Sequence, residues 1–200
     1  MKKGLIVLII IAVLGFSLYQ WGVGFNNTAV EYEADAKTAW SNVESAYQRR
    51  NDLIGNLVKT VQGAADFERG TLKDVIEARA EATATNIDAG NLTPDKMAAF
   101  QEAQSGLTGA LSKLMVVVER YPELKANQNF LELQSQLEGT ENRINVERNR
   151  YNDAVNVYDK HTTKFPGKLL AGLFGFGEMA RYSADPGSED APSTDFDFDN

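Results

Sequence analysis

The chain has 200 residues, no cysteine, one histidine and a formal net charge of −8 at pH 7. These counts exclude a disulfide framework, a thiolate zinc site, a cysteine nucleophile and a metal site built on several histidines. The negative charge also argues against nucleic acid, because a general nucleic-acid binder needs a basic face. We therefore expect no nucleic-acid partner and no cofactor.

Residues 1–24 are expected to form a transmembrane signal-anchor. Lys2 and Lys3 precede an apolar run, GLIVLIIIAVLGFSLYQWGVG, whose length matches the roughly twenty residues that cross a hydrocarbon core. Tyr19 and Trp21 stand where an aromatic belt meets the membrane surface. A cleaved signal peptide is the alternative, although no small-x-small cleavage site follows the apolar run. The two lysines favour a cytoplasmic N-terminus and a body on the outer side of the membrane.

The body of the chain, residues 25–180, shows apolar positions at the alternating spacing of helices. Residues 63–70 contain a weaker stretch between two glycines, where the chain either turns or continues as a helix. Before residues 63–70, the apolar stripe consists of Trp40, Val43, Tyr47, Ile54, Leu57 and Val61. After them, it resumes at Leu72, Val75, Ile76 and Ala80.

Two further helices are predicted after the break NIDAGNLTPD. Thr93 and Pro94 are typical of a helix start, and Pro122 closes that helix. The last long helix begins near Asn127 and ends before Phe165. No segment alternates with period two for long enough to predict a strand. The fold class is therefore all-α: an elongated antiparallel up-and-down bundle of three to four long helices, related to a coiled coil, behind an N-terminal transmembrane helix.

The segment GKLLAGLFGFGEMARY follows the last long helix and is strongly apolar. One interpretation makes it a helix that closes the bundle. The other places it in a membrane interface or against a neighbouring subunit. The residues concerned are Leu169, Leu170, Leu173, Phe174 and Phe176.

Residues 181–200 are predicted to form an acidic disordered tail. They include six acidic side chains, two prolines and a glycine, a composition that does not bury a core. The tail either keeps the protein soluble or docks a partner through Phe196 and Phe198.

Two arginines fall on the inward stripes of long helices. Arg50 follows Tyr47 in the first stripe, and Arg148 lies between Ile144 and Tyr151 in the last helix. A buried guanidinium needs a carboxylate or several carbonyl oxygens, and the candidate partners are Glu119 and Glu141. These four residues form either a ligand or acid–base site, or a polar core that sets helix register. Catalysis is disfavoured because arginine does not deprotonate at useful pH.

Two motifs resemble the LemA family. They are AWSNVESAYQRRNDLIGNLVKTVQG, residues 39–63, and VERYPELKANQNFLELQSQLEGTENRINVERNRYNDAVNVYD, residues 118–159. The resemblance implies a bacterial single-pass membrane protein with an elongated helical domain and no established enzymatic activity. The chain departs from the family at Gly55, where proline is usual, and at Phe67, where histidine is frequent. The second departure weakens any shared metal or acid–base site there.

The expected function is a helical scaffold or interaction protein anchored in the bacterial inner membrane. It would self-associate as a homo-oligomer or dock an unknown membrane or envelope protein, with the lipid bilayer contacted through the N-terminal helix. We expect no enzymatic activity. The alternative is an extracytoplasmic ligand-sensing bundle with a pocket around the inward arginines.

Overall fold

The structure is a computed structural model that describes residues 2–63, 68–85, 87–90 and 92–183. Its described residues contain helices, turns and extended segments, with no strand among them. The helices are α1 (Lys2–Gln62), α2 (Arg69–Ala84), α3 (Pro94–Val118), α4 (Pro122–Lys125), α5 (Gln128–Thr163) and α6 (Gly167–Phe174). The predicted all-α fold class is confirmed.

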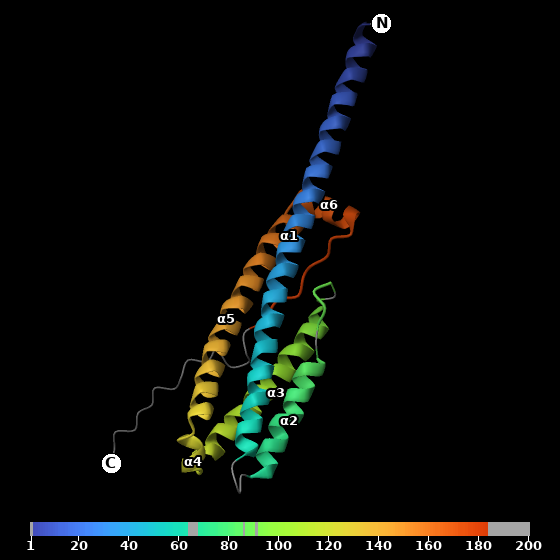
Figure 1. The fold of residues 1–200 in the computed structure, drawn as a ribbon. Helices are drawn as coiled ribbons and strands as arrows, with labels where there is room; N and C mark the ends of the chain where they lie inside the picture. The colour runs from blue at the N-terminus through green and yellow to red at the C-terminus, as the bar shows by residue number, and fades with distance from the viewer. Residues whose placement is uncertain (1, 64–67, 86, 91, 184–200) are drawn as a thin grey trace, which may run out of the picture.

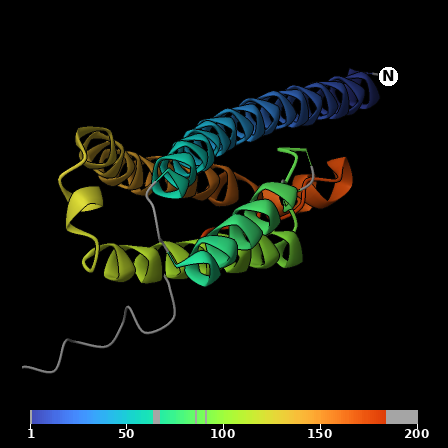
Figure 2. The same cartoon turned by 60° about the horizontal axis from the view of Figure 1, so that its bottom comes forward.

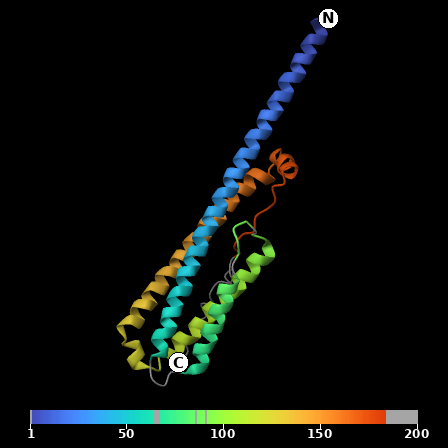
Figure 3. The same ribbon diagram turned by 45° about the vertical axis from the view of Figure 1, so that its right-hand side comes forward.

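The four long helices α1, α2, α3 and α5 run antiparallel in sequence order, with the short α4 at the turn before α5 (Figure 1). A view tilted toward the lower end of the bundle shows α1 and α5 on one side and α2 and α3 on the other, as two pairs facing each other (Figure 2). The helix α1 packs mainly against α5, and α2 against α3. The N-terminal part of α1 extends alone beyond the bundle (Figure 3). The result is a rod with a long stalk.

The helix α1 is continuous from Lys2 to Gln62, so the apolar N-terminal segment and the first bundle helix are one element. At 1.5 Å per residue, its 61 residues extend about 90 Å. Within the described residues, α1 is the one helix long and apolar enough to cross a membrane, and none of its apolar window is buried. Burial begins at Gly22 and Phe25. At that level Phe25 and Ala29 pack against Ala171 of α6.

Local signals mark the helix ends well. Thr93 caps α3 by accepting a hydrogen bond from the Lys96 amide at 3.4 Å, with Pro94 at the first helical position. Asn127 caps α5 by accepting from the amides of residues 129 and 130. The chain does turn between α1 and α2, since α1 ends at Gln62 and α2 begins at Arg69. Residues 64–67 of that connection lie outside the described residues.

Three apolar clusters follow one another along the rod. The distal cluster, farthest from the stalk, gathers residues from α1, α2, α3, α4 and α5, including Ile54, Leu57, Val75, Leu107 and Phe130. The middle cluster is rich in aromatic residues and includes Trp40, Tyr47, Phe100, Tyr151 and Tyr182. The junction cluster of Phe25, Ala29 and Ala171 lies where the stalk leaves the bundle. The predicted stripe of α1 is buried throughout, whereas Ile76 and Ala80 of α2 are exposed.

After α6 the chain turns back along the bundle as an extended segment, residues 175–183, which we call the C-terminal strap (Figure 1). Gly175 makes the turn with φ of 81°, a left-handed conformation that favours glycine. Tyr158 donates its hydroxyl to the Gly177 carbonyl at 2.9 Å, and Tyr151 donates to the Ala180 carbonyl at 2.6 Å.

The end of the C-terminal strap corrects the expected start of the tail. Tyr182 falls in the predicted tail, residues 181–200, yet it is buried in the middle cluster. Its amide and carbonyl both bond to the Asn152 side chain, at 3.0 and 3.1 Å. An aromatic ring with these partners belongs to the core whatever the composition around it. Residues 184–200 of the predicted tail lie outside the described residues.

We expect strongly alkaline pH to release the C-terminal strap. Burial raises the pKa of Tyr158 from 10.0 to about 12, and burial likewise raises the pKa of Tyr151. A tyrosine in the unfolded chain loses its proton near pH 10. The stabilisation from these buried hydroxyls is therefore complete below pH 10 and is lost as the pH rises through about 12.

Near-ultraviolet circular dichroism recorded with tyrosinate absorbance during an alkaline titration measures this release. The variant Tyr151→Phe keeps the ring without the hydroxyl and should lose part of the delayed titration. If all tyrosines titrate together near pH 10 without loss of the aromatic signal, the prediction fails.

Candidate functional site

The polar centre of the bundle is built around Arg50 on α1. Only 3% of the Arg50 surface is exposed, and its guanidinium lies 5.0 Å from the centre of the Tyr47 ring. Arg50 Nη1 donates to Glu141 Oε2 of α5 at 3.1 Å and to Thr108 Oγ1 of α3 at 3.4 Å. The buried charge therefore has a carboxylate partner.

Gln104 of α3 extends this network to α2, the remaining long helix. Arg50 Nη2 donates to the Gln104 side-chain oxygen and also lies 3.4 Å from the Gln104 carbonyl oxygen. Gln104 Nε2 in turn donates to the carbonyl of Ala82 in α2 at 3.3 Å. Side chains from α1, α3 and α5 and a carbonyl from α2 thus meet at one level. A connected polar layer of this kind favours one helix register over others.

Arg148, the second inward arginine of the sequence analysis, is placed differently. It is half-buried, its guanidinium lies 4.6 Å from the centre of the Tyr182 ring, and its Nη2 lies 3.4 Å from the Ser183 carbonyl. Arg148 therefore holds the end of the C-terminal strap, where a cation over an aromatic face is stabilising. Its charge also offsets part of the effect of burial, which raises the pKa of Tyr47.

Glu119 does not take part in the polar centre. It follows the last residue of α3, is exposed, and pairs with Lys125 across the turn that contains α4. The expectation that Glu119 partners an inward arginine is wrong, because the Arg50 level of α3 is at Gln104 and Thr108. Glu119 lies eleven residues beyond Thr108, on the order of 16 Å along the rod.

In α5 the charged residue that is buried is Glu147. It lies one position before Arg148, which the sequence analysis expected to turn inward. Glu147 is 4% exposed, and its Oε1 accepts from Arg150 Nη1 at 3.0 Å. Both positions fall between Ile144 and Tyr151, at steps of three and four residues. The apolar spacing alone did not distinguish them, and only the packing against neighbouring helices turned residue 147 inward.

A second arginine contact, missed in the sequence analysis, joins α1 to α2. Arg79 Nε donates to the Asn51 carbonyl at 2.8 Å, and the guanidinium lies beside Gly55, where a Cβ atom would be 3.1 Å from Arg79 Nη2. Gly55 therefore leaves room for the Arg79 side chain against the α1 backbone. The departure from proline at this position is compatible with an unbroken helix, which proline would interrupt.

Two clefts flank the polar centre. The smaller, of about 100 Å³, is lined by residues that include Arg50, Thr108, Glu141 and Arg148. The larger, of about 340 Å³, lies on the side of Asn51, Arg79 and Phe100. Among the described residues there is no group of three or more side chains that could hold a metal ion. The geometry of the centre is suited to holding four helices in register.

The stalk carries the remaining predicted membrane residues. Lys3, Tyr19 and Trp21 are exposed on α1, and Lys2 begins the helix, with its side chain outside the described residues. In α6, Leu169, Leu173 and Phe174 are exposed. Leu170 and Phe176 pack instead against the junction cluster. The predicted interface residues are thus divided between a packed face and an open face.

An apolar stalk continuous with a helical rod defines the class: a membrane-associated, all-helical bundle protein. The sequence model of the LemA family matches residues 39–196. The chain belongs to the LemA family, and the resemblance carried by the two motifs is confirmed.

Three known proteins are similar to this chain. Magnetosome protein MamQ 2 of Paramagnetospirillum magneticum is 30% identical, over 83% of this chain and 67% of its own length. Magnetosome protein MamQ of Magnetospirillum gryphiswaldense is 28% identical, over 82% and 66% respectively. Protein LemA of Metamycoplasma hominis is 24% identical, over 92% of this chain and 80% of its own length.

Proposed function

We propose that this protein is a membrane-anchored helical scaffold that self-associates or docks another membrane or envelope protein and has no chemistry of its own. The observation that carries this proposal is the continuity of α1 from its apolar segment into the bundle. A helix without a break transmits position and orientation from the membrane to the rod. A flexible linker would not keep the rod at a defined angle.

The polar centre supports a scaffold more than a binding site. Arg50 is already engaged by Glu141, Gln104 and Thr108. These contacts span the long helices and favour a single arrangement of the rod. A scaffold needs such a fixed shape to present the same surface to each partner.

The proposed location is the bacterial inner membrane, crossed once, with the bundle on the outer side. Two observations support it: the apolar segment long enough to span, and the lysines at positions 2 and 3 that favour a cytoplasmic N-terminus.

One experiment tests location and self-association together. A membrane-impermeant, amine-reactive crosslinker is added to cells whose outer barrier has been permeabilised, and the products are compared with those of a permeant reagent. We expect crosslinked dimers or larger species with both reagents. Products with the permeant reagent alone would reverse the orientation. Three results together would refute the scaffold proposal. They are no crosslinked product with either reagent, a monomer when the full-length protein is purified in detergent, and no membrane partner recovered with it.

The alternative is a ligand-sensing bundle, favoured by the cleft of about 340 Å³, which lies in the size range of small-molecule sites. It ranks second because Arg50, the charge expected to bind the ligand, is engaged by Glu141. If a small anionic ligand stabilised the wild-type protein and not the variant Arg79→Ala, this ranking would reverse.

A further inference from the structure

The inference concerns α6 and the residue that leads into it, Phe165, which together we call the foot. The foot lies crosswise at the point where the stalk leaves the bundle (Figure 1). Phe165 is 83% exposed, Leu169 is 68% exposed and Leu173 is 76% exposed. These three apolar side chains are spaced four residues apart. Apart from Lys168, the side chains of α6 are apolar, yet only one face of α6 is covered by the bundle.

The position of the foot is set by two close contacts with α1. A Cβ atom on Gly167 would lie 2.8 Å from a carbon of the Phe25 ring, so the start of α6 is pressed against residue 25. A Cβ atom on Gly22 would be 4.0 Å from the tip of the Phe174 ring, so the end of α6 lies at residue 22. The His161 ring, stacked on Phe25 at 4.4 Å, adds a contact from α5 at the same level. The foot therefore has a defined height on the stalk.

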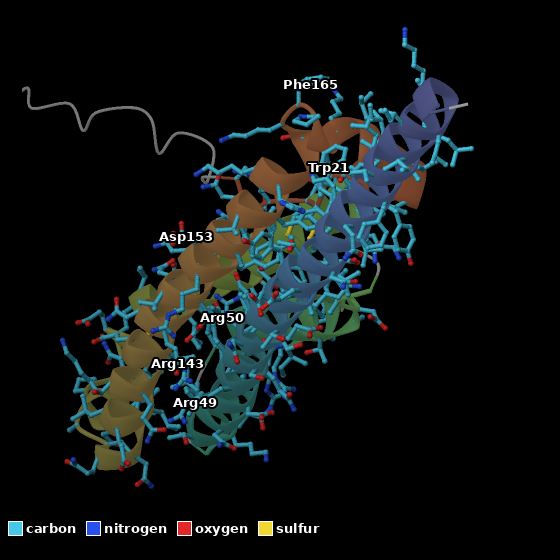
Figure 4. The ribbon with its side chains drawn as sticks, turned by 90° about the horizontal axis from the view of Figure 1, so that it is seen from above. Trp21, Arg49, Arg50, Arg143, Asp153 and Phe165 are labelled. Atoms are coloured by element: carbon cyan, nitrogen blue, oxygen red, sulfur yellow. The ribbon has the colours of Figure 1, made fainter. Side chains whose placement is uncertain are left out.

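That height coincides with the end of the apolar segment. Counted from Gly4, the ~20 residues needed to cross a hydrocarbon core end near Val23. The foot is thus within about one helical turn, roughly 5 Å, of the membrane surface. Trp21, an interfacial residue by its chemistry, and Phe165 lie toward the same end of the molecule (Figure 4).

The charge around the foot matches an anionic membrane surface. Residues 160–177 contain Lys160, Lys164 and Lys168 and no acidic residue, and all three lysines are exposed. The first acidic residue of α1 is Glu31, nine residues beyond Gly22 and on the order of 13 Å farther from the apolar segment. Lysines near a bilayer surface are attracted to anionic headgroups.

We propose that the foot is a second membrane-binding element, which inserts Phe165, Leu169 and Leu173 into the interface of an anionic bilayer with Lys164 and Lys168 at the headgroups. This inference rests on the proposed membrane anchoring by α1. Together, the foot and the stalk contact the membrane at two points, so they fix the angle of the rod. The unbroken α1 fixes the rod relative to the stalk, and the foot adds the contact that sets the tilt of the stalk in the bilayer.

Because the chain contains no cysteine, single cysteines can report on individual positions of the full-length protein. The variants Leu169→Cys and Leu173→Cys are labelled with an environment-sensitive fluorophore and reconstituted into phosphatidylcholine–phosphatidylglycerol vesicles at low protein density. A lipid carrying a shallow nitroxide quencher is then added. We expect a blue-shifted emission and strong quenching at both positions.

Two control positions separate the inference from the function on which it rests. Leu14→Cys lies in the middle of the apolar segment and should be quenched when the lipid carries its nitroxide deep in the acyl chain; if it is not, the membrane anchoring itself fails. Val116→Cys, on α3, replaces an apolar residue that is 72% exposed but far along the rod, and it should remain unquenched. The foot is refuted if Leu14→Cys is quenched while the two foot positions behave like Val116→Cys.

The same experiment distinguishes lipid from a second copy of the chain. If the foot positions are blue-shifted without quenching, and the shift disappears as the vesicles are diluted with lipid, a protein partner covers the foot and the lipid proposal is overturned. A further variant tests the role of the lysines. In the Leu173→Cys protein, the double substitution Lys164→Glu and Lys168→Glu should reduce quenching in anionic vesicles. Unchanged quenching would refute recognition of anionic headgroups.

Discussion

Replacing Trp40 with alanine should lower the free energy of unfolding by about 4 kcal/mol, the usual range for removing a fully buried tryptophan. Trp40 has no exposed surface, and its ring centre lies 5.3 Å from that of Tyr151 and 5.6 Å from that of Phe100. The indole Nε1 also donates to the Ile87 carbonyl at 3.0 Å, which secures the connection between α2 and α3. The substitution removes the contacts that α1 makes through this ring with α3, α5 and the C-terminal strap.

Thermal unfolding of the full-length protein in detergent, followed by circular dichroism, measures the effect. For a domain of this size, 4 kcal/mol corresponds to roughly 8–16 °C in the melting temperature. The chain offers a matched control in its other tryptophan: Trp21 is 42% exposed on the stalk, so Trp21→Ala should leave the bundle transition almost unchanged. Similar shifts for both variants would mean that the middle cluster does not hold the bundle together.

Replacing Arg50 with alanine should cost about 3 kcal/mol of stability, because it removes a buried guanidinium and its hydrogen bonds to three other residues. The melting temperature should fall by roughly 6–12 °C. The neighbouring exposed residue provides the control, since Arg49→Ala alters the same charge on the same helix without touching the polar centre. A shift of only a degree or two for Arg50→Ala would contradict the structural role.

The partner residue should show a smaller effect. The Glu141 side chain is 46% exposed, so water partly solvates its charge. The variant Glu141→Ala removes the carboxylate of a buried guanidinium, but Gln104 and Thr108 still accept from Arg50 and water can reach the vacated, partly exposed position, so we expect a cost of about 2 kcal/mol. The comparison of the two variants tests whether the buried guanidinium, rather than the ion pair alone, organises the four helices. Equal effects would assign the stability to the pair.

The regular elements were predictable because their signals are local. The stripe from Trp40 to Val61 and the caps at Thr93 and Asn127 each lie within a few turns of helix, and periodicity and capping act over that range. The partner of Arg50 depended on how the helices pack. The helical phase indicated that residue 50 turns inward, but Glu119 and Glu141 were equally acceptable partners until the relative heights of α3 and α5 were known.

The C-terminal strap was not predicted from the sequence. Tyr182 ends the apolar segment GKLLAGLFGFGEMARY and is followed by acidic residues typical of a tail. Its contacts are with Trp40, Asn152 and Arg148. Of these contacts, that with Trp40 joins residues more than a hundred positions apart. No pattern within the segment itself indicates them. The presence of an aromatic residue just before the acidic run was the one sign in the sequence.

The sequence by itself determined the helical class, the positions of the caps, the apolar stalk and the family, because each depends on neighbouring residues or on motifs read directly. Only the tertiary structure decided that α1 continues from stalk to rod, that Glu147 rather than Arg148 turns inward, and that the foot stands at the end of the apolar segment. Those features depend on contacts between distant helices. The free energy of such contacts is set by packing in three dimensions, where one residue of phase moves a side chain about 100° around its helix.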